Sequence, residues 1–144
     1  MAVKVGINGF GRIGRLVARA ILEKNSKDIE LVAINDLTDA ASNAYLFKYD
    51  SVHWRFNADV KATAPDVISV NGKGIKVLSK TDPAELPWKD LGVEIVIEST
   101  GLFTIKKDGV NKKGKIVRGA ENHITCGGAN KVIISAPDEG EDIT

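Results

Sequence analysis

Three glycines near the N-terminus have the spacing that a dinucleotide-binding turn requires. Gly9, Gly11 and Gly14 follow an apolar segment, residues 3–7, and open a stretch, residues 13–21, in which hydrophobic side chains recur at helical spacing. The first glycine permits a tight turn out of a strand, the second lets bare backbone approach a pyrophosphate, and the third lets the helix pack closely on the sheet. The N–H groups at the start of the helix then face the phosphates. The segment therefore predicts that the chain binds a dinucleotide.

An acidic residue, Asp36, follows the second predicted strand, residues 30–35. It stands about 20 residues beyond the last glycine, where a carboxylate accepts hydrogen bonds from the hydroxyls of the adenosine ribose. Leu37 comes next, and no arginine stands immediately beside the acid to receive a 2′-phosphate, so the sequence favours NAD over NADP. The alternative interpretation is a glycine-rich turn in an ordinary α/β protein, with Asp36 as a helix cap.

Predicted strands and helices alternate along the rest of the chain. The first is a short helix over residues 40–49 that buries Ala44, Leu46, Phe47 or nearby aromatics, and an antiparallel hairpin of residues 67–70 and 75–78 around the turn 71–74 follows it. Next come a buried strand over residues 93–98 and a solvated loop over residues 106–115. The last two elements are a helix through Val117, Ala120 and Ile124 that ends at Gly127 and Gly128, and a buried strand over residues 130–136. This order predicts an α/β fold of the Rossmann type, a doubly wound, mostly parallel sheet with an inserted antiparallel hairpin.

In such a fold the ligand binds beyond the carboxyl ends of the strands. The loops after the predicted strands are therefore expected to meet at one crevice, following Ile7, Ile34, Ile97 and Ile134. The residues at those ends are small or polar, and they are Asn8, Asp36, the segment 99–101 and Ser135. They suit the sugars, phosphates and carboxamide of a cofactor.

Composition restricts the class of protein. The 144 residues suffice for one domain, and the 20 basic and 19 acidic side chains leave no charged field for a polyanion. No apolar run has the length of a membrane span, and the start of the chain carries no signal-peptide pattern. We therefore expect a cytoplasmic protein with neither a membrane nor nucleic acid as its primary partner. The single cysteine, Cys126, excludes an internal disulfide.

Five ordered motifs resemble those of the phosphorylating glyceraldehyde-3-phosphate dehydrogenases. They are Ile7-Asn8-Gly9-Phe10-Gly11-Arg12-Ile13-Gly14-Arg15, Ala33-Ile34-Asn35-Asp36-Leu37, Leu46-Phe47-Lys48-Tyr49-Asp50-Ser51, Glu98-Ser99-Thr100-Gly101-Leu102-Phe103 and Lys131-Val132-Ile133-Ile134-Ser135-Ala136-Pro137. The resemblance spans nearly the whole chain, so it is far more specific than the glycine pattern alone.

The resemblance implies NAD as cofactor and a role for each matching residue. The implied cofactor-binding residues are Asn8 and Asn35, the pyrophosphate cradle of Gly9, Phe10, Gly11, Arg12 and Ile13, then Asp36 at the adenosine ribose, Thr81, Thr100, Gly101 and Phe103 on the adenine side, and Ser135 near the nicotinamide half. Four of these have a plainer interpretation. Asn8 could be a turn residue and Arg12 could serve an interface, while Phe103 could be packing and Ser135 a hydroxyl bonded to backbone.

Two positions depart from the family's pattern. Thr81 stands where these enzymes usually have an arginine beside the adenine, so only a backbone contact could survive there. Trp54 replaces the usual glycine after His53, which we interpret as a structural or surface histidine. The loop over residues 106–115 is also longer than is common.

The family's reaction also needs groups that do not match this sequence. Its thiolate comes from a Ser-Cys-Thr-Thr-Asn motif and is activated by a catalytic histidine, and neither that motif nor a match to that histidine is found here. Cys126 lies in Ile124-Thr125-Cys126-Gly127-Gly128, for which we expect a structural role as a small buried hydrophobe. No catalytic residue and no metal site is expected.

We therefore expect residues 1–144 to be the NAD-binding domain, inactive without a catalytic domain. The whole enzyme, a homotetramer by resemblance, would oxidise glyceraldehyde 3-phosphate, a small phosphorylated aldehyde, to 1,3-bisphosphoglycerate with NAD and phosphate. Two alternatives remain open at this point. One is the N-terminal domain of an erythrose-4-phosphate dehydrogenase, and the other is a stand-alone module that senses NAD or NADH without catalysis.

Overall fold

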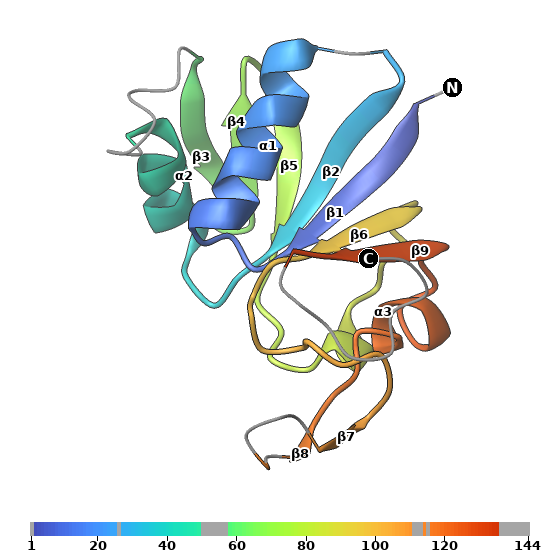
Figure 1. Ribbon diagram of the computed structural model, residues 1–144. Coiled ribbons are helices and arrows are strands. Elements are labelled where there is room, and N and C mark those ends of the chain that lie inside the picture. Colours follow the sequence, from blue (N-terminus) through green and yellow to red (C-terminus); the bar gives the residue numbers. More distant parts are fainter. Residues whose placement is uncertain (1, 26, 50–57, 111–113, 115, 136–144) are drawn as a thin grey trace.

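A seven-stranded sheet forms the centre of the molecule in the computed structural model, which describes residues 2–25, 27–49, 58–110, 114 and 116–135 (Figure 1). The elements in chain order are β1 (Val3–Asn8), α1 (Arg12–Lys24), β2 (Ile29–Asn35), α2 (Ala40–Lys48), β3 (Val60–Ala64), β4 (Val67–Val70), β5 (Lys73–Leu78), the 3-10 helix η1 (Pro83–Glu85), β6 (Ile95–Glu98), β7 (Gly109–Val110), β8 (Ile116–Val117), α3 (Asn122–Thr125) and β9 (Lys131–Ile134). The strand order is β3-β4-β5-β2-β1-β6-β9. Five neighbouring strands of this sheet, β5, β2, β1, β6 and β9, are parallel to one another, which confirms the predicted Rossmann-type fold class.

The predicted hairpin is present, and it is also part of the main sheet. Strands β4 and β5 pair in antiparallel fashion around Asn71 and Gly72, which both have positive φ, at 51° and 84°. Such angles are typical of the two-residue turn that Asn-Gly favours. On its other edge β5 pairs with β2 in parallel, so the hairpin joins the sheet directly. Strand β3, which the sequence did not reveal, extends the same edge.

The two faces of the sheet carry separate hydrophobic cores. On one face α1 and α2 cover a core that includes Ile7, Phe10 and Phe47. On the other face, where α3 lies (Figure 1), a smaller core contains Trp88 and Val96. None of the described helices is long and apolar enough to cross a membrane.

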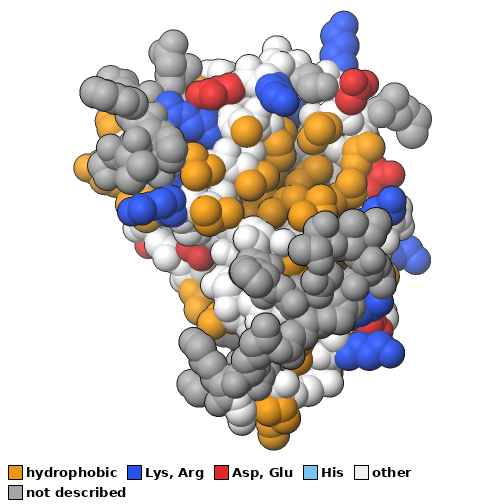
Figure 2. Space-filling model, in the orientation of Figure 1, with side chains coloured by type: hydrophobic (Ala, Val, Ile, Leu, Met, Phe, Trp, Pro, Cys, Tyr) orange, Lys and Arg blue, Asp and Glu red, His pale blue; other side chains and the backbone are white. Residues whose placement is uncertain are grey.

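The packing of α1 buries its small residues more completely than the large hydrophobic ones that recur at helical spacing. Its buried residues are the small Gly14 and Ala18, because the helix lies close on the sheet there. Val17 and Ile21 pack partly against the core, whereas Ile13 is 47% exposed. Figure 2 shows hydrophobic side chains gathered beside α1, over the part of the sheet that it does not cover.

Several expectations about the other elements were wrong. Leu46 on α2 is exposed while Ala44 and Phe47 are buried as predicted, because the short helix turns only part of its surface to the sheet. The last strand is only half-buried, with Ile133 54% exposed, because β9 is an edge strand with one neighbour.

The segment before β9 also differs from its prediction. Instead of the predicted helix through Val117, Ala120 and Ile124, the chain forms the strand β8, paired with β7 of the expected loop, and then the one-turn α3. Ile124 and Cys126 are exposed, so the cysteine is not the buried hydrophobe that we expected. His53 and Trp54 lie outside the described residues.

Candidate functional site

The carboxyl ends of the parallel strands are level with one another. Asn8, the last residue of β1, is paired with Asn35 of β2 on one side and with Glu98 of β6 on the other. The row continues to Leu78 of β5 and Ile134 of β9. The loops after these strands therefore meet at one edge, as expected. Because the chain leaves β1 toward β2 and returns much later to β6 on its other side, this edge is also the topological switch point where such sheets bind ligands.

The glycine turn is packed tightly at two of its three glycines. Gly9 has a φ of 92°, and a Cβ built on it would lie 2.7 Å from the amide nitrogen of Thr100. A Cβ on Gly14 would lie 2.1 Å from the carbonyl oxygen of Gly9. A Cβ on Gly11 would meet nothing within 4 Å. The packing of the chain thus requires glycine at positions 9 and 14. Gly11 instead faces open space of the kind that a pyrophosphate would fill.

The start of α1 presents backbone donors at this open space. Gly11 is the N-cap, no side chain caps it, and the first turn contains no acidic residue. Arg12 and Ile13, the first two residues of the helix, are exposed. Phe10 packs edge-on against Phe47 in the core with ring centroids 5.3 Å apart, so only its backbone faces the turn. An uncapped N-terminus of a three-turn helix favours an anion.

Asp36 emerges half-buried from the end of β2. Its amide bonds to the carbonyl oxygen of Leu78, and its carboxylate accepts a hydrogen bond from the Thr38 amide at 3.3 Å. The cap of α2 is Asp39, whose carboxylate accepts from the Ser42 amide at 2.7 Å, a bond that lowers the pKa of Asp39. Asp36 is therefore not the helix cap of the alternative interpretation.

The other residues predicted for the site lie on loops at the same edge. Thr100 and Phe103 are half-buried, and Gly101 is exposed with a φ of 74°. Ser135 is exposed after β9, and its amide bonds to the carbonyl oxygen of Glu98. Thr81 is exposed next to Lys80, whose amide and carbonyl groups both bond to the side chain of Asn35.

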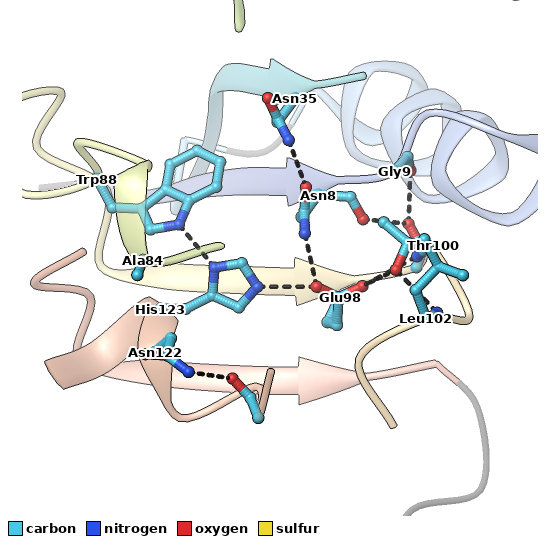
Figure 3. A network of polar contacts seen from close by, with 12 residues as sticks. Asn8, Gly9, Asn35, Ala84, Trp88, Glu98, Thr100, Leu102, Asn122 and His123 are labelled. Atoms are coloured by element: carbon cyan, nitrogen blue, oxygen red, sulfur yellow. Dashed lines mark hydrogen bonds and ion pairs between the residues drawn. The ribbon is translucent and has the colours of Figure 1, made fainter. Parts of the chain in front are cut away.

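A buried polar network that no sequence pattern indicated lies behind these loops (Figure 3). The Asn35 amide group donates to Asn8 Oδ1 at 2.7 Å, and Asn8 Nδ2 donates to Glu98 Oε1 at 2.7 Å. Both oxygens of Glu98 take further bonds, from Thr100 and from His123. The one available signal was a charged residue at the end of the apolar run 93–98. His123 gave none, because nothing local in the sequence places it under β6.

These features together define a class of protein. A glycine turn that leads into an uncapped helix, an acid after the second strand and a switch point in a parallel sheet make this a Rossmann-type dinucleotide-binding domain. Comparison with protein families gives a model described as "Glyceraldehyde 3-phosphate dehydrogenase, NAD binding domain", which matches residues 3–106. The chain belongs to this NAD-binding family.

Curated relatives match over the entire chain or nearly so. It is 56% identical over 144 residues to a glyceraldehyde-3-phosphate dehydrogenase of Streptomyces coelicolor, covering 100% of this chain and 39% of the relative. It is 55% identical over 141 residues to glyceraldehyde-3-phosphate dehydrogenases of Bacillus cereus and of Thermotoga maritima, covering 98% of this chain and 38% of each relative. The chain thus spans less than two fifths of the length of these relatives. Their names do not favour an erythrose-4-phosphate dehydrogenase.

Proposed function

We propose that residues 1–144 form the cofactor domain of a cytoplasmic, homotetrameric glyceraldehyde-3-phosphate dehydrogenase. The whole enzyme would oxidise glyceraldehyde 3-phosphate to 1,3-bisphosphoglycerate with NAD and phosphate. The observation that carries the proposal is the open space at Gly11, at the uncapped start of α1 and between two glycines that the fold itself requires.

The residues present fit NAD at this edge. The backbone from Gly9 to Ile13 would hold the pyrophosphate, and the Asp36 carboxylate would accept from the adenosine ribose. Thr81, Thr100, Gly101 and Phe103 would line the adenine side and Ser135 the nicotinamide side. Asn8 and Asn35 have buried side chains bonded within the protein, so they would support the crevice from behind.

The chemistry of the bound cofactor is acceptance of a hydride at its nicotinamide ring. This chain would bind and orient the cofactor for that step, and we propose that it contributes no catalytic group. Purified as the 144-residue chain, it should bind NAD and fail to reduce it when glyceraldehyde 3-phosphate and phosphate are supplied. Formation of NADH by this chain would contradict the proposed division between two domains.

Calorimetric titration with NAD tests the ligand assignment. Asp36→Ala should weaken binding by about 1 to 3 kcal/mol, because it removes the acceptor for two ribose hydroxyls. Asp39→Ala is the matched control, since it removes a carboxylate three residues away that caps α2. The control should lower stability and leave the affinity for NAD unchanged. Equal affinities of the parent and Asp36→Ala would remove Asp36 from the site.

A further inference from the structure

The buried side chain of Glu98 accepts hydrogen bonds from Asn8, Thr100 and His123, and the proposed function assigns it no role. It ends β6 and is only 2% exposed. Its Oε2 accepts from the amide and the hydroxyl of Thr100, at 3.0 and 2.7 Å, and its Oε1 accepts from Asn8 at 2.7 Å (Figure 3). The carboxylate therefore connects the turn after β1 with the turn after β6.

Backbone groups fix the direction of the hydrogen bonds on the Asn8 side. The Lys80 N–H can only donate, so the group of Asn35 that receives it at 2.8 Å is the oxygen. The nitrogen of Asn35 then donates to Asn8 Oδ1, which leaves the nitrogen of Asn8 facing Glu98. Glu98 Oε1 must accept here.

An indole fixes the direction on the other side. Trp88 Nε1 can only donate, and it lies 2.9 Å from Nδ1 of His123. Nδ1 is thus the acceptor, and the ring proton is on Nε2, which donates to Glu98 Oε1 at 2.8 Å. The Thr100 amide is also an obligatory donor. Every partner of Glu98 in this network donates, so an acceptor is required at both of its oxygens.

The two turns that Glu98 joins are in direct contact at the proposed pyrophosphate cradle. Thr100 packs on Gly9 so closely that no side chain fits between them, and the Ser99 hydroxyl donates to the Gly9 carbonyl oxygen at 2.6 Å. An error in the position of either turn would therefore move the backbone that faces the phosphates. Binding sites have lower affinity when their supporting groups are mobile, because part of the binding free energy is then used to order those groups.

We propose that Glu98 is a positioning residue for NAD binding: its carboxylate holds the turn at Asn8 and Gly9 and the turn at Thr100 in their binding geometry before the cofactor arrives. This inference rests on the proposed function. Burying a carboxylate is unfavourable unless its hydrogen bonds are satisfied, and an apolar side chain would suit the adjoining core of Trp88 and Val96 better. The partners of Glu98 instead include Asn8 and Thr100, which belong to the two turns at the proposed pyrophosphate cradle.

Glu98→Gln tests the proposal because it keeps the shape and places an amide N–H₂ against a donor. Val96→Ala is the matched control, since Val96 is buried two residues earlier on the same strand and in the same core, and is absent from the network. Both variants should lower stability. At a temperature where all three proteins are folded, Glu98→Gln should raise the Kd for NAD at least tenfold, and Val96→Ala should change it by less than twofold.

A spectroscopic readout separates positioning from stability. In ¹H–¹⁵N spectra without NAD, Glu98→Gln should shift the Thr100 and Gly9 amide resonances, and Val96→Ala should leave them in place. An affinity of Glu98→Gln within twofold of the parent, or the same loss in Val96→Ala, would overturn the role of Glu98 alone. A parent chain that does not bind NAD would overturn the proposed function as well.

The unaltered chain decides the question if Glu98→Gln does not fold. Preorganisation requires that the Thr100 amide be protected from hydrogen exchange before NAD is added, to an extent comparable with the amides of β6. Rapid exchange of the Thr100 amide in the free chain, with protection only after NAD is added, would overturn the proposal.

Discussion

Thr100 lies directly against Gly9, and the two residues interlock the loops after β6 and β1. A Cβ on Gly9 would come 2.7 Å from the Thr100 amide nitrogen and 2.8 Å from its Cα, both of them backbone atoms. A side chain at position 9 therefore cannot be accommodated by a rotamer change. The glycine turn is a constraint of the fold in addition to a feature of the site.

Gly9→Ala is accordingly expected to destabilise the chain by about 2 to 4 kcal/mol, as the sum of overpacking against Thr100 and the strain of a positive φ. Gly72→Ala is the control, because Gly72 also has a positive φ, at 84°, and a Cβ placed on it would meet nothing within 4 Å. It should cost about 1 to 2 kcal/mol. Urea denaturation measures both, and equal losses would show that contact with Thr100 is unimportant.

Gly11→Ala should separate binding from folding. Gly11 has extended backbone angles, φ −77° and ψ −159°, and open space at the position of a Cβ. Alanine at this N-cap should change the free energy of unfolding by less than about 1 kcal/mol. It should weaken NAD binding about tenfold or more, because the methyl group enters the path of the pyrophosphate. Unchanged affinity in a titration would show that the phosphates do not approach Gly11.

Local sequence signals predicted the elements that are governed by local chemistry. The glycine turn at Gly9 and the hairpin turn at Asn71-Gly72 were both predicted correctly. Their backbone has positive φ, which few residue types adopt, so the residue types themselves indicated the turns. The meeting of the loops at the carboxyl ends of the strands was also predictable, because it follows from the parallel order of the strands. These features need no knowledge of distant contacts.

Features that depend on distant contacts were not predictable. The register between β1 and β2 shifts between Val5 and Gly6, so that Leu31 and Ala33 face successive residues of β1 and simple alternation fails. The helix predicted over residues 117–124 is replaced by the β7–β8 pair and the short α3. The hydrogen bonds of Glu98 bring together residues from β1, from the loop after β6 and from α3. No spacing in the sequence indicates that Asn8, Thr100 and His123 meet at one carboxylate.

His123→Ala is predicted to be strongly destabilising, by about 3 to 5 kcal/mol. It leaves a cavity at a fully buried position, an unpaired Trp88 N–H and one donor fewer for Glu98. Cys126→Ala, at the exposed end of the same short helix, is the control and should change stability by less than about 0.5 kcal/mol. Thermal unfolding followed by circular dichroism compares the two, and a small loss in His123→Ala would show that the network contributes little.

The stability of the chain in acid should depend on Asp108. Its carboxylate accepts from the Gly119 amide, from Asn122 and from Arg118, and these bonds hold the pKa of Asp108 below its ordinary value of 3.8. Because the folded state binds the proton more weakly than the unfolded chain, this contribution is complete above pH 3.8 and is lost as the pH falls through the lowered pKa. The free energy of unfolding from urea titrations should therefore decrease as the pH falls below about 3.8. Asp108→Asn should be less stable than the parent at neutral pH and should show a shallower decrease in acid, whereas parallel pH profiles would show that Asp108 does not contribute.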